Sequence, residues 1–187
     1  MTNIKYGFVA LLAGLTGQIA VAATPIDFIT HNQIEVNAPA SAIWPFVMQM
    51  ERWKKGASLV PIDGAPNRLG SKFKMLQEGG NVGWTFENVE LVPQQIRTLR
   101  MNGPDGTLIG YATLRLIPHG RSTLVRYDVL AVFPATPDLA KPDDRARILA
   151  ESSKRFDEEL ATLKELSEGG RRRHFPNASP TMEADHP

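Results

Sequence analysis

The period of the hydrophobic pattern changes once along the chain, near Pro142, and this change limits the folds that the sequence can adopt. Before it, short apolar stretches alternate with turns. After it, the residues that recur at three- and four-residue spacing are Leu149, Ser152, Phe156, Leu160 and Leu163. Such spacing places these residues on one side of an α-helix. Because a sheet with one apolar face needs a covering layer, the sequence predicts strands packed against one long C-terminal helix.

Six stretches before Pro142 have the composition of strands: Ser58–Asp63, Ser71–Leu76, Gly83–Leu91, Ile96–Met101, Ile109–Ile117 and Thr123–Phe133. Turn sequences such as Asp63-Gly64 separate them, and connections this short join antiparallel neighbours. Another strand is predicted at residues 26–37, followed by two short helices, one after Pro39 and one at Met48–Lys54. The predicted fold class is therefore α+β, a curved antiparallel sheet of about seven strands wrapped around a long C-terminal helix.

The first 23 residues have the organisation of a secretory signal peptide. A short polar segment with one cation, Lys5, precedes the uncharged and mostly apolar stretch Gly7–Val21, and Ala22 and Ala23 supply small residues for cleavage. The alternative is a retained membrane anchor, but a span needs about 20 strongly apolar residues, and polar and glycine residues interrupt this stretch. We therefore expect cleavage after Ala22 or Ala23 and a periplasmic or secreted protein.

The rest of the chain has room for one domain, which we place at residues 26–168. Residues 169–187 are predicted to be a disordered tail, because they contain three prolines, scattered charges and no periodicity. Without residues 1–23, whose only charged residue is Lys5, the chain has 20 basic and 20 acidic residues. This balance argues against nucleic acid as a partner. The absence of cysteine excludes a thiol nucleophile and a cysteine-based zinc site.

Four stretches carry a likeness to one superfamily: Ile34–Pro39 with Ile43-Trp44, Trp53, Glu90–Ile96 and Leu114–Tyr127. In this order and spacing they resemble the START/pollen-allergen-like superfamily, called SRPBCC, and in particular its polyketide cyclase/dehydrase and lipid-transport branch. The resemblance implies a helix-grip fold with a cavity between the middle strands and the long helix. It also implies a hydrophobic or amphipathic ligand, such as a lipid or an aromatic polyketide-like molecule.

The residues that the resemblance predicts to line this cavity are Trp84, Phe86, Met101, Tyr111 and Phe156. Trp84 and Phe86 are two apart on one predicted strand, so they point to the same face. Small-molecule sites favour concave apolar spaces of this kind. The alternative is that these side chains only fill the core.

Arg126, Asp128 and Tyr111 are the candidate catalytic residues. Arg126 and Asp128 share a strand face, and inside a cavity Arg126 would orient a ligand carboxylate or phenolate while Asp128 acts as a base. Tyr111, Arg100 and Arg115 are on strands that would neighbour this pair. On the outer face of the sheet, by contrast, Arg126 and Asp128 would form a solvated pair worth under about 1 kcal/mol.

No metal or cofactor site is predicted. The histidines are far apart in the sequence and lack the spacing of a metal site: His31, His119, His174 and His186. The sequence also lacks the GxSxG turn of hydrolases and a phosphate-binding loop.

Three functions fit this sequence. The first is a periplasmic binding or carrier protein for a hydrophobic or amphipathic small molecule, touching a membrane only transiently if the ligand is a lipid. The second is a cofactor-free cyclase or dehydratase that uses polar residues of the same cavity, and the third is a protein-interaction module with a filled core. Two or more of four polar residues in one cavity would favour the enzyme: Arg100, Tyr111, Arg126 and Asp128. A wholly apolar cavity would favour the carrier, and no cavity the interaction module.

Overall fold

The structure is a computed structural model that describes residues 26–65, 67–76, 84–103, 105–133 and 141–169. The predicted signal peptide and the predicted tail beyond Gly169 lie outside the described residues. The elements are, in chain order, β1 (Ile26–Val36), α1 (Ala40–Met48), the 3₁₀-helix η1 (Met50–Arg52), β2 (Ser58–Asp63), β3 (Lys72–Leu76), β4 (Thr85–Val92), β5 (Ile96–Asn102), β6 (Leu108–His119), β7 (Ser122–Phe133) and α2 (Pro142–Ser167).

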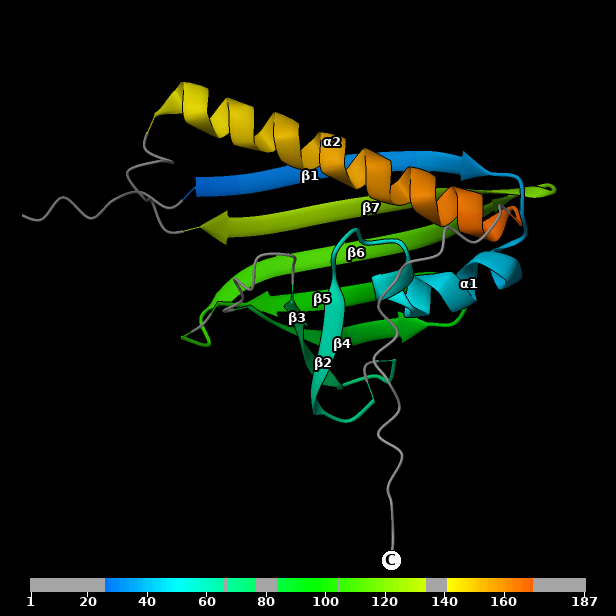
Figure 1. Cartoon of the computed structure of the whole chain (residues 1–187), viewed down its shortest axis with the longest axis horizontal. Helices are drawn as coiled ribbons and strands as arrows, with labels where there is room; N and C mark the ends of the chain where they lie inside the picture. Colours follow the sequence, from blue (N-terminus) through cyan, green and yellow to red (C-terminus); the bar gives the residue numbers. More distant parts are fainter. Residues whose placement is uncertain (1–25, 66, 77–83, 104, 134–140, 170–187) are drawn as a thin grey trace, which may run out of the picture.

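The strands form one seven-stranded sheet in the order β1-β7-β6-β5-β4-β3-β2 (Figure 1), and every neighbouring pair is antiparallel. Strands β2 to β7 lie in sequence order, and the connections from β4 to β5 and from β6 to β7 are short. In the β6–β7 loop, for example, Gly120 has a φ of 63°, which the first position of a type II′ turn requires. Strand β1 returns to pair with β7, with Ile26 opposite Phe133. The predicted α+β fold class is confirmed.

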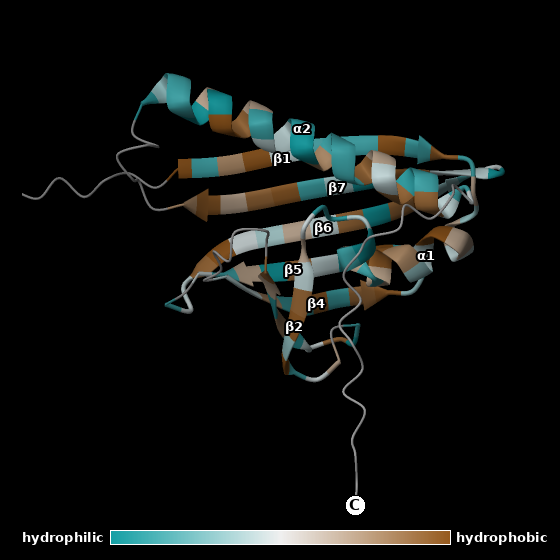
Figure 2. Ribbon diagram, in the orientation of Figure 1, coloured by the Kyte–Doolittle hydropathy of each residue, from teal (hydrophilic) through white to brown (hydrophobic). Residues whose placement is uncertain are grey.

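Helix α2 supplies the covering layer that the change of period predicts. It packs against β1 and α1, and Figure 1 shows it running along β1 and β7. Most of its face visible in Figure 2 is hydrophilic. The residues that it buries are Phe156, Glu159, Leu160 and Leu163. One side of the helix therefore belongs to the interior, and that side includes one carboxylate.

The second short helix differs from its prediction at Met48–Lys54. Helix α1 already includes Met48, and only a single 3₁₀ turn, Met50–Arg52, follows it. Trp53 ends this turn, because its backbone N–H donates to Met50 O at 3.1 Å and its indole Nε1 donates to Phe46 O at 2.9 Å. The turn leaves Lys54 buried against the interior of the molecule.

A buried polar cluster fixes α1 to the sheet. Arg97 of β5 is 2% exposed; its Nη1 donates to Val47 O at 2.7 Å and its Nε donates to Asn88 Oδ1 at 2.8 Å. Asn88 in turn donates to Ser71 Oγ at 2.9 Å. Burial lowers the pKa of Arg97 to about 10, which still leaves the guanidinium charged at neutral pH. This cluster holds α1, and through it η1, in position beside the inner face of the sheet.

Candidate functional site

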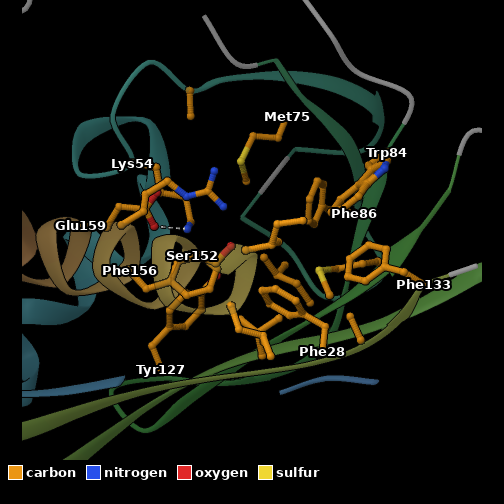
Figure 3. Close-up of a pocket in the computed structure, with 18 of the residues that line it drawn as sticks. Phe28, Lys54, Met75, Trp84, Phe86, Tyr127, Phe133, Ser152, Phe156 and Glu159 are labelled. Atoms are coloured by element: carbon orange, nitrogen blue, oxygen red, sulfur yellow. Dashed lines mark hydrogen bonds and ion pairs between the residues drawn. The ribbon is translucent and has the colours of Figure 1, made fainter. Parts of the chain in front are cut away.

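A cavity of about 430 Å³ lies between the inner face of the sheet and α2. Volumes of about 300–1,000 Å³ are typical of small-molecule sites. Strands β1, β3, β4, β5 and β7 contribute to its wall, and α2 and the segment that follows η1 complete it. Figure 3 shows how the side chains of the wall converge on a common space. The cavity therefore has the size and position of a ligand site.

One end of the cavity is aromatic. Trp84 stacks on Phe133 with 5.5 Å between the ring centroids, and Phe28 meets Phe133 edge-on at 5.6 Å. Phe86 lines the same space and stacks on Phe73 behind it at 5.7 Å. Trp84, Phe86, Phe28 and Phe133 lie together on one side in Figure 3. These rings offer faces and edges to the apolar body of a ligand.

The other end of the cavity is polar. Lys54 Nζ lies 2.6 Å from Glu159 Oε2, and the two side chains are only 7% and 8% exposed. Figure 3 shows this pair on the opposite side from Trp84, with Ser152 and Phe156 close to it. A buried ion pair is stable only while both partners are present, because either charge alone would lack solvation.

Three aromatic rings surround the Lys54 ammonium. Its Nζ lies 4.8 Å from the ring centre of Trp53, 4.8 Å from that of Tyr127 and 5.5 Å from that of Phe156. Burial by itself would lower the pKa of Lys54, but Tyr127 and Glu159 outweigh it and raise that pKa above its ordinary value. The lysine is therefore a charged hydrogen-bond donor inside a mainly apolar space.

Four of the five residues predicted to bind ligand line the cavity: Trp84, Phe86, Met101 and Phe156. Tyr111 does not. Gly110 and Ala112 of β6 are buried while Tyr111 is 39% exposed, and because side chains alternate along a strand, Tyr111 points away from the interior. The expectation that Tyr111 lines the cavity is therefore corrected.

The predicted polar pair lies on the outer face of the sheet. Asp128 accepts hydrogen bonds from Arg126 Nε at 2.9 Å, from His31 Nδ1 at 2.7 Å and from Arg115 Nη1 at 3.4 Å. Burial alone would raise the pKa of Asp128, but the bonds from His31 and Arg126 outweigh it and hold that pKa below its ordinary value. Neither Arg126 nor Asp128 lines the cavity, so the structure separates this pair from any ligand held there.

Arg100 is on the same outer face. It pairs with Glu87 at 3.9 Å and lies opposite Tyr111 in the β5–β6 register. All four polar residues chosen to distinguish an enzyme from a carrier therefore lie outside the cavity. The cavity is not wholly apolar either, because polar residues of β1, of the chain after η1 and of α2 also line it.

Among the lining residues that sequence reasoning missed are three of the polar end: Lys54, Tyr127 and Glu159. Two of them have a signal in the sequence. Tyr127 alternates with Arg126 and Asp128, so the outward position of those two residues implies that Tyr127 points inward. Glu159 is three residues after Phe156 and four before Leu163, which places it on the apolar stripe of α2. Lys54 has no such signal, because a single 3₁₀ turn decides its direction.

Among the described residues, no group of histidine and acidic side chains has the arrangement of a metal site. Within the same ranges, no helix combines the length and the apolar composition that a membrane span requires.

The sequence matches no protein-family model and no curated protein. The structure, however, is similar to solved ones. The Aha1 dimer from Colwellia psychrerythraea has a TM-score of 0.58 at 16% identity, over 76% of this chain and 98% of that chain. The Zhui aromatase/cyclase from Streptomyces sp. R1128 also has a TM-score of 0.58 at 16% identity, over 78% of this chain and 99% of that one.

Truncated norcoclaurine synthase from Thalictrum flavum has a TM-score of 0.54 at 16% identity, over 76% of this chain and 94% of that chain. At such identities the likeness concerns the fold and not the chemistry. The order of the strands, the packing of α2 on β1 and the likeness to these solved structures all indicate the same fold. This chain shares its fold, a seven-stranded antiparallel sheet covered by a long C-terminal helix, with these solved structures, and this is the helix-grip fold that the resemblance in its sequence predicted.

Proposed function

We propose that this protein is an exported carrier that binds one hydrophobic or amphipathic small molecule in the cavity between its sheet and α2. The observation that carries the proposal is the cavity itself, about 430 Å³ in volume and walled mainly by apolar side chains. A core that served only packing would close such a space, because protein interiors are close-packed. The similarity to an aromatase/cyclase and to norcoclaurine synthase supports a small-molecule site in this fold.

A carrier is favoured over an enzyme by the position of the predicted polar residues. Arg126 and Asp128 are on the outer face, and the charged pair in the cavity, Lys54 with Glu159, is already matched at 2.6 Å. A general base must lie within hydrogen-bond reach of the proton that it abstracts, whereas the charged groups of Lys54 and Glu159 are directed at each other. The aromatic end, with Trp84 stacked on Phe133, instead offers contact area. Export is proposed from the signal-peptide pattern of residues 1–23.

Binding of N-phenylnaphthylamine, an uncharged dye whose fluorescence rises in apolar surroundings, tests the proposal. We expect saturable binding of one dye per folded chain, because burial of apolar area contributes about 25 cal/mol per Å². Native mass spectrometry of protein purified from the exporting cell should show a co-purified small molecule. Dye fluorescence no higher than with a compact control protein of the same size would refute the carrier proposal and leave a filled interaction module.

A further inference from the structure

Basic side chains gather at the polar end of the cavity. The wall of the cavity includes four basic residues, Lys54, Lys55, Arg145 and Arg155, and two acidic ones, Asp27 and Glu159, of which Glu159 lies at this end. The carboxylate of Glu159 is occupied by Lys54 at 2.6 Å. This end of the cavity therefore carries an excess of positive charge.

The ring of Phe156 brings two of these cations together. Lys54 Nζ lies 5.5 Å from the centre of the ring, and Arg155 Cζ lies 5.3 Å from it. Lys54 has a carboxylate partner, but Arg155 forms no ion pair with any carboxylate of the described residues. A guanidinium at the wall of a cavity, held over a ring and without an anion, has donors available for a ligand.

The two ends of the cavity thus favour different chemical groups within one ligand. The aromatic end, where Trp84 stacks on Phe133, excludes charge, because an ion there would lose its solvation. The polar end offers the Arg155 guanidinium and the remaining N–H groups of Lys54. We propose that the ligand is an organic anion, a carboxylate or similar acid on an apolar body, with its charged group held between Arg155 and Lys54. This inference rests on the proposed carrier function and names its ligand class.

A matched pair of dyes tests it. Anilinonaphthalenesulfonate and N-phenylnaphthylamine share the same aromatic groups, and only the first carries an anion. We expect both to bind the parent protein, and we expect added salt to weaken only the sulfonate dye, since screening acts on charge. Binding of neither dye would refute the carrier function itself. Equal salt dependence and equal affinity of the two dyes would overturn the anion site while leaving the carrier function intact.

Arg155→Met is the decisive variant, because Arg155 is exposed and its loss leaves the Lys54–Glu159 pair in place. We expect it to weaken the sulfonate dye about tenfold, as the loss of one charge-assisted contact does, and to change the neutral dye less than about twofold. Arg155→Lys should restore most of the affinity.

The matched control is Arg147→Met on the same helix, because Arg147 pairs with Asp144 and Glu151 and is not part of the cavity wall. Equal effects of Arg155→Met and Arg147→Met would refute the site.

The body of the natural ligand, aliphatic or aromatic, is distinguished by displacement of the sulfonate dye. Dodecanoate and naphthoate carry the same carboxylate on the two kinds of body, and dodecanol and naphthol are their uncharged counterparts. Displacement by one acid and not by its alcohol supports the anion site and shows which body fits. Displacement by the alcohols as effective as that by the acids would overturn it.

Discussion

Lys54 and Glu159 form a buried ion pair in which Nζ and Oε2 are 2.6 Å apart, 105 residues separating them in the chain. One partner follows the 3₁₀ turn η1 and the other comes from the apolar side of α2. The pair therefore joins the N-terminal and C-terminal parts of the domain at the wall of the cavity. Loss of one partner of this buried pair should cost more free energy of unfolding than loss of one partner of an exposed pair.

Lys54→Met should destabilise the protein by about 3–5 kcal/mol, because it leaves the Glu159 carboxylate buried and unpaired. The double change Lys54→Met with Glu159→Leu should recover most of this loss, since it removes both charges and keeps the volume. Urea unfolding of the parent and the variants measures the difference. Because the pKa of Lys54 is raised, the contribution of the pair should stay unchanged from neutral pH to about pH 10 and decline only as the pH rises further. A double variant no more stable than Lys54→Met would contradict this account.

Asp128→Asn should cost about 1 kcal/mol at neutral pH, since its partners His31 and Arg115 are largely exposed and screened. The pKa of Asp128 is held below its ordinary value, so its stabilising contribution is present above about pH 4 and is lost as the pH falls through the folded-state pKa. The difference between parent and Asp128→Asn should therefore be retained at about pH 5 and shrink progressively as the pH falls below about 4. Thermal unfolding across this range measures it.

The same variant separates the outer face from the cavity. Because Asp128 lies on the other side of the sheet from the ligand, Asp128→Asn should leave dye affinity within about twofold of the parent's. A loss of dye binding in a folded Asp128→Asn protein would show that the two faces are coupled.

The mature protein should begin at Ala23 or Thr24. The prediction comes from the small residues Ala22 and Ala23 that follow the apolar stretch. N-terminal sequencing of the protein recovered from its native cell decides it. Intact Met1 on a membrane-bound form would show an anchor instead.

The fold could be predicted from the sequence because it depends on periodicity and turns, which are local. The change from a strand pattern to the helical spacing of Phe156, Leu160 and Leu163 predicts the long helix. Turns such as Gly120-Arg121 predict that the strands on either side of them are antiparallel neighbours. Two residues of the aromatic end could be predicted for the same reason, since alternation along a strand assigns Trp84 and Phe86 to one face.

The polar end could not be predicted in this way. Alternation places Tyr127 on the face of β7 opposite Arg126 and Asp128, but which of the two faces borders a cavity depends on the packing of α2. Lys54 turns inward because the 3₁₀ turn before it ends at Trp53, whose indole bonds to Phe46 O. Such an arrangement depends on contacts between distant segments and leaves no periodic signal.

Phe156→Ala should destabilise the protein by about 3–5 kcal/mol, because Phe156 is 7% exposed and its removal enlarges the existing cavity. It also removes the edge-on contact with Tyr127 at 5.2 Å between ring centroids. Glu158→Ala, an exposed change on the same helix, should cost only a few tenths of a kcal/mol. Chemical denaturation of the two variants compares them, and equal midpoints would contradict the packing of α2 on the sheet.

Ser152→Phe should fill the cavity from the side of α2. Ser152 lines the space and is half-buried, so a phenyl ring at this position occupies the volume that a ligand needs and gains apolar burial. We expect the affinity for N-phenylnaphthylamine to fall at least about tenfold while the melting temperature stays equal to the parent's or rises. Ala150→Phe, an exposed position on the same helix, adds the same ring outside the cavity and should leave binding unchanged. If Ser152→Phe is folded and binds the dye as tightly as the parent does, the dye occupies another site and the cavity is not where this protein holds its ligand.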